Sequence, residues 1–489
     1  MHFESVFFLT SDCMGVKNGP SHGEVMITED GPCLVEMNCR AHGGDGNWRP
    51  LCKALTGGYS QVEATADAIL EPEKFARLPD KPCSPFKASG LEVILVSFSR
   101  GKVKAMPGYE VMKALPSFLS LETGVKPGTE VDYTIDLMTG IGSVMLMHPD
   151  ADVIKRDTEF IRYMEQFNGI FQYETKLENL KRPTGDGVML EPFATEPERP
   201  LTPISGKPPR PHRRVFSSDG PVLFRHMSND RPELRGPLVK RMTTVDASKE
   251  LVVIVDPYST GCCIAEEIVK RGYQVMALWT KGFAEEMKSH VPLSVGEIKY
   301  LAQVDEADSL PDTVAAVYKA ANQYRVVACI AGGEAGVDLA DALSERMSLR
   351  TNGTIIPNKR DKKLQQELIA QRGMRSVRQA GGAKFEDVEE FLKTEPYPVV
   401  LKPLESAGSD GVKLCHTFEE AKEHFDVLMK SQMVNGGDCP AVLCQEFLRG
   451  KEYVVDHVSR DGVHKTVMVW VYDKRPVNGA AVRHSCMIA

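Results

Sequence analysis

The stretch HGEVMITEDGPCLVEMNCR, residues 22 to 40, carries the pattern that decides the fold. It has two strand-like halves on either side of Asp30-Gly31, a dipeptide typical of a tight hairpin turn. Side chains on a strand alternate between its two faces, so Glu36, Asn38 and Arg40 are expected to share one face. The hairpin would bring Glu24 opposite them.

This face is a candidate metal site. Two carboxylates and an amide oxygen are hard ligands suited to Mg²⁺, and a neighbouring guanidinium suits a phosphoryl or carboxylate group. An exposed strand with alternating polar residues would give the same pattern without a site. The Gly-rich HGGDG that follows, residues 42 to 46, favours the metal interpretation, so Glu24, Glu36 and Asn38 are the predicted ligands.

The opposite face of the hairpin is apolar and needs a partner. Its residues are Val25, Ile27, Leu34 and Met37. The alternating stretch 452–474 offers such a partner through Val454, Val469 and Val471. The other elements expected in the N-terminal half are a helix over 59–70, a second hairpin over 91–108 and a helix over 152–168.

The C-terminal half opens as an α/β domain. The buried-strand runs LVVIVD (251–256) and VVACIA (326–331) are each followed by a Gly-containing turn and a helical pattern, which indicates a doubly wound parallel sheet. The second turn, GGEAG (332–336), is a weak dinucleotide signal because it lacks GxGxxG. An antiparallel α+β pattern follows, with helices over 361–373 and 418–431 and strands over 397–404, 441–448 and 452–474.

A Pro-rich segment separates the two halves. Residues 181–240 hold eleven of the 31 prolines, which favours an extended linker. The predicted organisation has five parts: a metal-strand region, a small lobe, the linker, a leading α/β domain and a nucleotide-binding region. Their residues are 1–85, 86–175, 176–248, 249–350 and 351–489.

Composition limits the function classes. The net charge of −8 argues against a general nucleic-acid binder, which needs a basic face. No apolar run is long enough to span a membrane. The apolar stretch near the N-terminus is too short for a signal peptide, and an acidic residue, Glu4, precedes it. The twelve cysteines show no CxxC and no regular spacing, which predicts free thiols in the cytoplasm.

A second cluster of chemistry lies in the C-terminal half. Lys362 begins a helix and Lys402 ends a strand. The small-residue loop PLESAGSDGV (403–412) follows, and its backbone N–H groups and hydroxyls could cover phosphates, although taken alone it reads as a generic turn. A Walker loop is excluded because GxxxxGK[ST] is missing.

These signs resemble the ATP-grasp superfamily, in its carboxylate–amine ligase branch similar to L-amino-acid ligases. The resemblance rests on Asp361-Lys362, the strand Lys402 with its Ser/Gly loop, the hinge strand from Gln445 to Glu452, and the ExNxR end of the metal strands. It implies an ATP-grasp fold in two halves, mixed α/β and α+β, with a Rossmann-like leading domain and a small additional lobe.

The resemblance also implies roles for individual residues. Lys362 and Lys402 would bind the ATP phosphates, and the loop over the γ-phosphate would use Ser406, Gly408, Ser409 and Gly411. Gln445 and the backbone near Leu448 would read adenine, and Glu452 the ribose. Glu24, Glu36 and Asn38 would hold two Mg²⁺ ions, with Mn²⁺ as the alternative. Arg40 would meet the transferred phosphoryl group, so Arg40 and Lys402 are the predicted catalytic residues.

The order of the two halves departs from the family, because the ExNxR half comes first here. The chain is interpreted as a slice of a tandem ATP-grasp protein, a circular permutant or the product of a faulty gene model, with the slice favoured. The linker is nevertheless long enough to let the halves meet, with an end-to-end distance on the order of 45–50 Å. Assembly of one site within one chain is therefore expected.

The predicted function is an ATP-dependent carboxylate–amine ligase that forms an amide through an acyl phosphate. Its expected partners are a small carboxylic acid or amino acid and an amine, with self-association or an adjacent ATP-grasp module as further contacts, and neither nucleic acid nor membrane. The alternatives are a catalytically inactive nucleotide-binding fragment and, from the leading α/β domain alone, an oxidoreductase.

Overall fold

A computed structural model describes residues 3–135, 139–174, 247–404, 411–431, 439–478 and 480–488. The compact unit that contains them combines residues 1–185 and 246–489, so it joins both halves of the sequence. The predicted fold class is confirmed, because these residues form a mixed α/β structure with several sheets.

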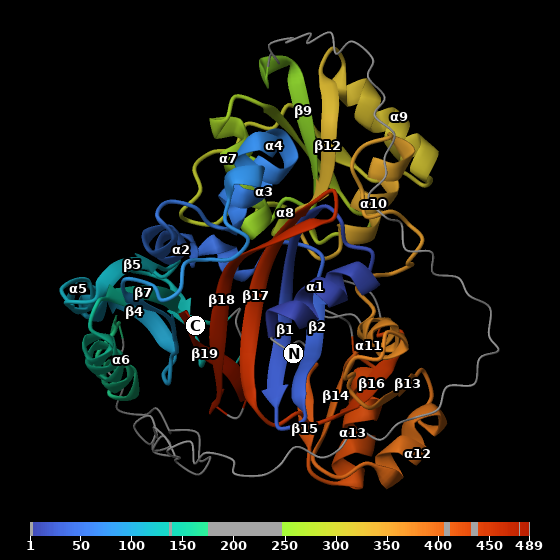
Figure 1. Ribbon diagram of the computed structural model, residues 1–489. Helices are drawn as coiled ribbons and strands as arrows, with labels where there is room; N and C mark the ends of the chain where they lie inside the picture. Colours follow the sequence, from blue (N-terminus) through green and yellow to red (C-terminus); the bar gives the residue numbers. More distant parts are fainter. Residues whose placement is uncertain are drawn as a thin grey trace, which may run out of the picture. The chain divides into compact units, whose positions relative to one another are not determined.

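The largest sheet is built from both halves of the sequence (Figure 1). Among the residues described, its eight strands run in the order β2-β1-β17-β18-β19-β3-β7-β5. The C-terminal half supplies the middle, and the N-terminal half supplies both edges. The strands are β2 (Gly31–Asn38), β1 (Gly19–Thr28), β17 (Lys451–Arg460), β18 (Val463–Val477), β19 (Ala480–Ile488), β3 (Ser89–Leu95), β7 (Gly142–His148) and β5 (Phe118–Glu122).

Helices and short strands of the N-terminal half accompany this sheet. The predicted helices over 59–70 and 152–168 are found as α3 (Gln61–Leu70) and α6 (Ala151–Gln166). A capping box at Ser60 and Glu63 explains where α3 begins, because each side chain satisfies a backbone N–H of the first turn. The remaining elements are α1 (Phe3–Cys13), η1 (Gly44–Gly46), α2 (Arg49–Thr56), α4 (Pro72–Arg77), β4 (Gly101–Ala105), α5 (Pro107–Lys113), β6 (Glu130–Val131) and β8 (Gln172–Tyr173).

The predicted hairpin over 91–108 is wrong. Strand β3 pairs with β19 and β7, whereas β4 pairs with β6 and β8. The reason is that β3 is almost wholly buried as an inner strand, with a neighbour on each side, so neither edge is left for β4.

A four-stranded parallel sheet confirms the α/β pattern predicted after residue 249. Within the described residues its order is β11-β10-β9-β12, with β9 (Glu250–Val255) and β12 (Arg325–Ala331) adjacent. Its other elements are η2 (Ala247–Lys249), α7 (Thr260–Lys270), β10 (Gln274–Trp279), α8 (Glu285–Lys288), β11 (Gln303–Asp305), α9 (Leu310–Ala321) and α10 (Val337–Arg346).

An antiparallel sheet carries the predicted nucleotide-binding strands. Its order is β13-β16-β14-β15. The elements are α11 (Lys362–Gln371), β13 (Gln379–Gly382), α12 (Glu386–Thr394), β14 (Val399–Pro403), β15 (Lys413–Cys415), α13 (Phe418–Leu428) and β16 (Val442–Glu446). Asp361 caps α11, because its carboxylate accepts the backbone N–H groups of Lys363 and Leu364.

Hydrophobic packing joins the metal-strand hairpin to the C-terminal half. Val25, Leu34 and Met37 share a buried cluster with Ile369 of α11 and Val469 of β18. The predicted partner is therefore correct for Val469. It is wrong for Val454, which lies in another core with Trp470 because Val455, one residue further along β17, is paired with Val469.

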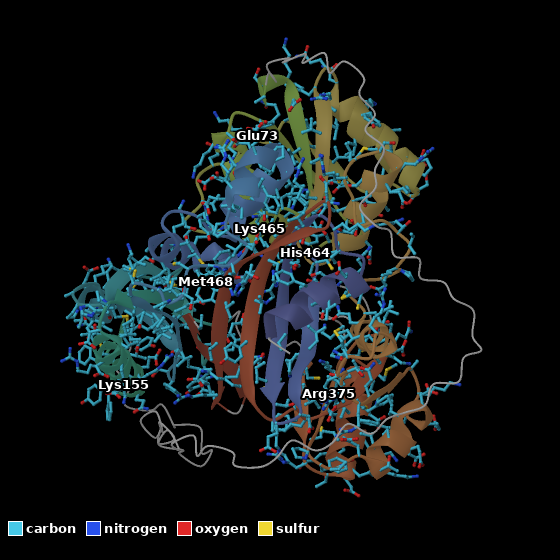
Figure 2. All side chains as sticks on the ribbon, in the orientation of Figure 1. Glu73, Lys155, Arg375, His464, Lys465 and Met468 are labelled. Atoms are coloured by element: carbon cyan, nitrogen blue, oxygen red, sulfur yellow. The ribbon has the colours of Figure 1, made fainter. Side chains whose placement is uncertain are left out.

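Figure 2 shows the side chains along these strands, with His464 and Met468 labelled on β18.

Among the described residues, no helix is both long and apolar enough to cross a membrane.

Candidate functional site

One face of the large sheet collects the predicted metal ligands. Directly opposed residues in an antiparallel ladder share a face. Glu24 of β1 is paired with Glu36 of β2, and His22 is paired with Asn38. On the other side of β1, His22 is paired with Asp456 of β17. Residues from opposite ends of the chain are thus placed side by side by strand register.

A β-bulge explains how the hairpin separates its polar and apolar residues. Val25 is paired with Leu34 but Glu24 with Glu36, so Val35 is an extra residue in β2. An extra residue changes the alternation of faces. Leu34 and Met37 therefore both reach the apolar core, and Glu36 and Asn38 both reach the opposite face.

Glu36 meets the C-terminal half through lysines. The Nζ of Lys362, at the start of α11, lies 3.3 Å from Glu36 Oε2, and Asn38 Nδ2 donates to Glu36 Oε1 at 3.1 Å. Burial opposes ionisation of Glu36, but the charges of Lys362 and Lys402 outweigh it and lower its pKa to about 2. This carboxylate is ionised at any physiological pH.

Lys402 ends β14 next to the same group. It is buried, and its charge interacts with those of Glu36 and Lys362. Burial lowers the pKa of the Lys402 ammonium, the attraction of Glu36 raises it and the neighbouring Lys362 lowers it, which together hold it at about 8. Lys402 is therefore still mostly charged at neutral pH.

Glu24 is tied to Glu452 and Lys474. The Nζ of Lys474, on β18, lies 2.6 Å from Glu452 Oε1 and 3.4 Å from Glu24 Oε2. Burial and the neighbouring Glu24 carboxylate raise the pKa of Glu452 to about 7. Glu452, predicted to bind ribose, thus lies near the predicted metal ligand Glu24.

These six residues are called the carboxylate–lysine cluster below: Glu24, Glu36, Glu452, Lys362, Lys402 and Lys474. As described, it balances three carboxylates with three ammonium groups. A group of buried charges of both signs can accept a polyanion together with divalent cations without a large change in net charge.

The other predicted nucleotide residues occupy the antiparallel sheet and its exit. Gln445 is buried in β16, where its Nε2 donates to Gln379 Oε1 at 2.8 Å. Leu448 is half-buried between β16 and β17. The carbonyl of Gly411 bonds to His424 Nε2 at 2.9 Å. Ser406, Gly408 and Ser409 lie outside the described residues.

A close approach of two backbones marks the entry to β17. Gly450 has a φ of 157°, and a Cβ on it would lie 2.0 Å from the carbonyl oxygen of Ile27. Any larger residue there would push the β1 backbone away, so a glycine is required where the C-terminal half meets the metal strands.

Arg40 departs from the prediction. Strand β2 ends at Asn38, so Arg40 does not share a strand face with Glu36. It turns instead to the parallel sheet, where its Nε donates to Glu334 Oε2 at 2.7 Å and its Nη1 to the carbonyl of Ala41 at 2.8 Å. Its charge still interacts with that of Glu36. Glu334 belongs to the GGEAG turn, whose weak match to a dinucleotide motif gave no sign of this contact.

A second buried polar cluster adjoins the first. The carboxylate of Asp456 lies 3.0 Å from His22 Nδ1 and 3.0 Å from His42 Nδ1, and it accepts Trp470 Nε1–H at 2.7 Å. His42 Nε2 is 3.1 Å from the Tyr472 hydroxyl. These five residues are called the His–Asp cluster. His22 Nε2 also lies 3.9 Å from Glu24 Oε1, which links the two clusters.

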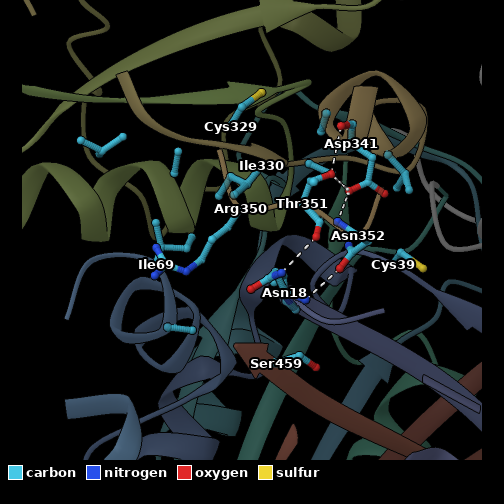
Figure 3. A pocket seen from close by; sticks show the side chains of 18 residues that line it. Asn18, Cys39, Ile69, Cys329, Ile330, Asp341, Arg350, Thr351, Asn352 and Ser459 are labelled. Atoms are coloured by element: carbon cyan, nitrogen blue, oxygen red, sulfur yellow. Dashed lines mark hydrogen bonds between the residues drawn. The ribbon is translucent and has the colours of Figure 1, made fainter. Parts of the chain in front are cut away.

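Figure 3 shows a small cavity between the two halves of the sequence. It encloses about 60 Å³ beside Asn18, Thr351 and Asn352, which are joined by hydrogen bonds. A nucleotide needs several hundred Å³. None of the predicted site residues that the structure describes lines it. This cavity marks where the two halves are bonded together, not where a substrate sits.

Known proteins resemble parts of this chain. Dapdiamide A synthase of Enterobacter agglomerans is 29% identical over 238 residues, 48% of this chain and 55% of that protein. Phosphoribosylamine–glycine ligase of Caldanaerobacter subterraneus is 34% identical over 94 residues, 19% of this chain and 22% of that protein. The chain thus spans about half of the first relative's length and less of the second. No protein-family profile matches.

Solved structures give more distant matches. The L-amino acid ligase from Bacillus licheniformis aligns with a TM-score of 0.34 at 16% identity, over 46% of this chain and 50% of that one. N5-carboxyaminoimidazole synthetase from Staphylococcus aureus, complexed with ADP, aligns with a TM-score of 0.33 at 15% identity, over 47% and 56%.

Proposed function

We propose that this chain, an ATP-grasp carboxylate–amine ligase by its relatives, joins a small carboxylic acid to an amine at the expense of ATP. The observation that carries the proposal is the meeting of Glu36 with Lys362 and Lys402. The carboxylate proposed to bind metal comes from one half of the sequence. It lies 3.3 Å from Lys362 of the other half and interacts electrostatically with Lys402, the two lysines proposed to bind phosphate.

The donor set fits Mg²⁺. Glu24, Glu36 and Asn38 place oxygen-bearing side chains on one sheet face, and oxygen donors are what this ion prefers. Bound there, Mg²⁺ would supply charge neutralisation on the phosphates. The proposal includes two ions, with Mn²⁺ as a substitute.

The chain's own residues act by position and charge. Lys362 and Lys402 would hold the phosphates of ATP while the substrate carboxylate attacks the γ-phosphorus in line and ADP leaves. Arg40, whose charge interacts with that of Glu36, would stabilise the resulting acyl phosphate. An amine then attacks the acyl carbon; the C–O bond to phosphate breaks, an amide forms, and phosphate and a proton are released.

The remaining parts of the prediction belong to this proposal. Gln445 and the Leu448 backbone would contact adenine, and the loop with Ser406, Gly408, Ser409 and Gly411 would cover the γ-phosphate. The pairing of β1 with β17 supports a permuted module assembled within one chain over a slice whose halves need outside complements. The five-part division, self-association and a cytoplasmic location remain predictions.

The test is ADP release from Mg-ATP with panels of amino acids and small acids, with and without added amines. We expect acid-dependent ADP release, an amide detected by mass spectrometry, and a hydroxamate when hydroxylamine traps the acyl phosphate. The matched control is Asp461→Asn, which removes an exposed pair with Arg350 outside the site. Tight Mg-ADP binding without any turnover would favour the inactive nucleotide-binding alternative, and binding of a nicotinamide cofactor would favour the oxidoreductase.

A further inference from the structure

Glu334 is a buried carboxylate that reaches the site from the parallel sheet. Its side chain is 6% exposed and lies between two arginines, with Arg40 Nε at 2.7 Å from Oε2 and Arg360 Nε at 3.5 Å from Oε1. A buried carboxylate is costly unless it is paired, so this arrangement fixes all three groups together. Glu334 and Arg40 are separated by 294 positions in the sequence.

The turn that holds Glu334 is pressed against the end of β9. The Gly332 N–H donates to the Val255 carbonyl at 2.7 Å, and a Cβ on Gly332 would lie 2.8 Å from the Asp256 carbonyl oxygen. A Cβ on Gly333 would lie 2.2 Å from a ring carbon of Tyr258. The two glycines are needed for this close packing, which gives Glu334 a rigid base.

The turn also occupies the place where an open α/β sheet offers a ligand site. From β9 the chain adds β10 and then β11 on one side, and it then crosses over to add β12 on the other side of β9. The order of strands therefore reverses between β9 and β12, which is the topological switch point of the sheet. Ligands of such sheets bind outside the carboxyl ends of the strands at this switch point. Asp256 and Gly332 follow directly after those two strands.

Two edges of the Arg40 guanidinium are therefore fixed. Glu334 takes the Nε edge, and the Ala41 carbonyl takes Nη1. The plane of the guanidinium relative to Glu36, with which Arg40 interacts electrostatically, depends on both contacts. A preorganised charge stabilises a transition state more than a mobile one, because no reorganisation is needed during the reaction.

We infer that Glu334 is a positioning residue of the ligase reaction, which holds the Arg40 guanidinium toward the acyl phosphate, with Arg360 as the second cation that anchors Glu334. The inference rests on the proposed function and adds the parallel sheet's switch point to the active site.

The kinetic test compares Glu334→Ala, Glu334→Gln and Glu334→Asp. We expect kcat to fall on the order of 100-fold in Glu334→Ala, with the KM for ATP within about twofold of the wild type, because misplacement of one group by about 1 Å has that effect. Glu334→Asp should recover part of kcat. In an Arg40→Lys background, Glu334→Ala should have little further effect, because lysine has no Nε edge for Glu334 to hold.

The matched control is Asp341→Asn. Asp341 is a buried carboxylate of α10 paired with Lys359 Nζ at 3.0 Å, so its loss imitates the structural cost without touching Arg40. Its kcat per folded molecule should stay within about twofold. Equal losses of kcat in Glu334→Ala and Asp341→Asn, or additive losses with Arg40→Lys, would overturn the inference.

A binding measurement separates this inference from the proposed function. Orthophosphate is titrated into each protein with Mg-ADP present, which needs no turnover. We expect phosphate binding weakened about tenfold in Glu334→Ala and unchanged in Asp341→Asn, since only the first variant frees the Arg40 guanidinium. A wild type that makes no ADP with any acid refutes the proposed function alone, whereas unchanged phosphate affinity in Glu334→Ala refutes the positioning role alone.

Discussion

The His–Asp cluster and the carboxylate–lysine cluster are neighbours on one sheet face, but they balance their charges differently. In the first, one carboxylate has three donors: Asp456 lies against His22, His42 and Trp470. In the second, Glu452 and Glu24 compete for Lys474, and burial together with Glu24 raises the pKa of Glu452 to about 7. A network centred on one fully bonded carboxylate stabilises the fold, whereas two buried carboxylates that share one ammonium group are suited to binding a cation.

The largest expected effect is on turnover in the carboxylate–lysine cluster. Glu36→Gln should reduce Mg-dependent ADP release by about 10²–10³-fold, because the interaction of Glu36 with the metals is lost. Nucleotide affinity measured without metal should change little. Unchanged ADP release would reject Glu36 as a ligand.

The next effect is on the stability of the His–Asp cluster. Asp456→Asn should lower the free energy of unfolding by about 3–5 kcal/mol, because it breaks a buried network of charge-assisted hydrogen bonds. In Glu452→Gln, Lys474 keeps Glu24 as a partner, so the loss should stay below about 2 kcal/mol. Denaturant unfolding in EDTA measures both. Equal losses would remove the distinction between the clusters.

The two clusters should also respond to pH with opposite sign. The pKa of Glu452 is raised from 4.5 to about 7 in the folded chain. Between these values the folded chain binds more protons at Glu452 than the unfolded chain does, so the contribution of Glu452 to the free energy of unfolding falls as the pH rises. Burial opposes ionisation of Asp456, but its histidines lower its pKa, so its stabilisation is present above its ordinary value and is lost on acidification.

Glu452→Gln should therefore remove the Glu452 contribution, so that between pH 4.5 and 7 in EDTA its stability relative to the wild type increases as the pH rises. Thermal unfolding across the pH range gives both slopes, and a wild type that becomes more stable through this window while Glu452→Gln does not would contradict the assignment.

The smallest expected effect is at the edge of the His–Asp cluster. Tyr472→Phe removes the hydroxyl beside His42 Nε2 and should cost about 1 kcal/mol of stability. Tyr163→Phe is the matched control, since Tyr163 is 57% exposed and its substitution should be neutral. Two equal values would show that the hydroxyl contact contributes nothing.

Elements with a strong local signal could be predicted from the sequence. The Asp30-Gly31 turn and the alternation on both sides of it predict the hairpin of β1 and β2, and the curated relatives confirm the resemblance to ATP-grasp ligases. The carboxylates Glu24 and Glu36 are opposed as expected, because the turn sets their register.

Long-range choices could not be predicted. Val35 forms a β-bulge in β2 and changes the face on which the following residues lie. This bulge was not predicted from the sequence. The local pattern of β3 predicts half of a hairpin, but the strand pairs with β19 and β7. That pairing depends on strands far away in the sequence. Glu334 was missed because its partner Arg40 is brought near only by folding.

The central claim is that residues from both ends of the chain form one metal–nucleotide site. It is tested most directly by a crystal structure of the wild type with ADP and Mn²⁺, whose anomalous scattering locates the ions. The claim predicts Mn²⁺ at Glu24, Glu36 and Asn38, with the diphosphate against Lys362 and Lys402. Nucleotide density away from Lys402, or Mn²⁺ bound away from Glu36, would contradict it.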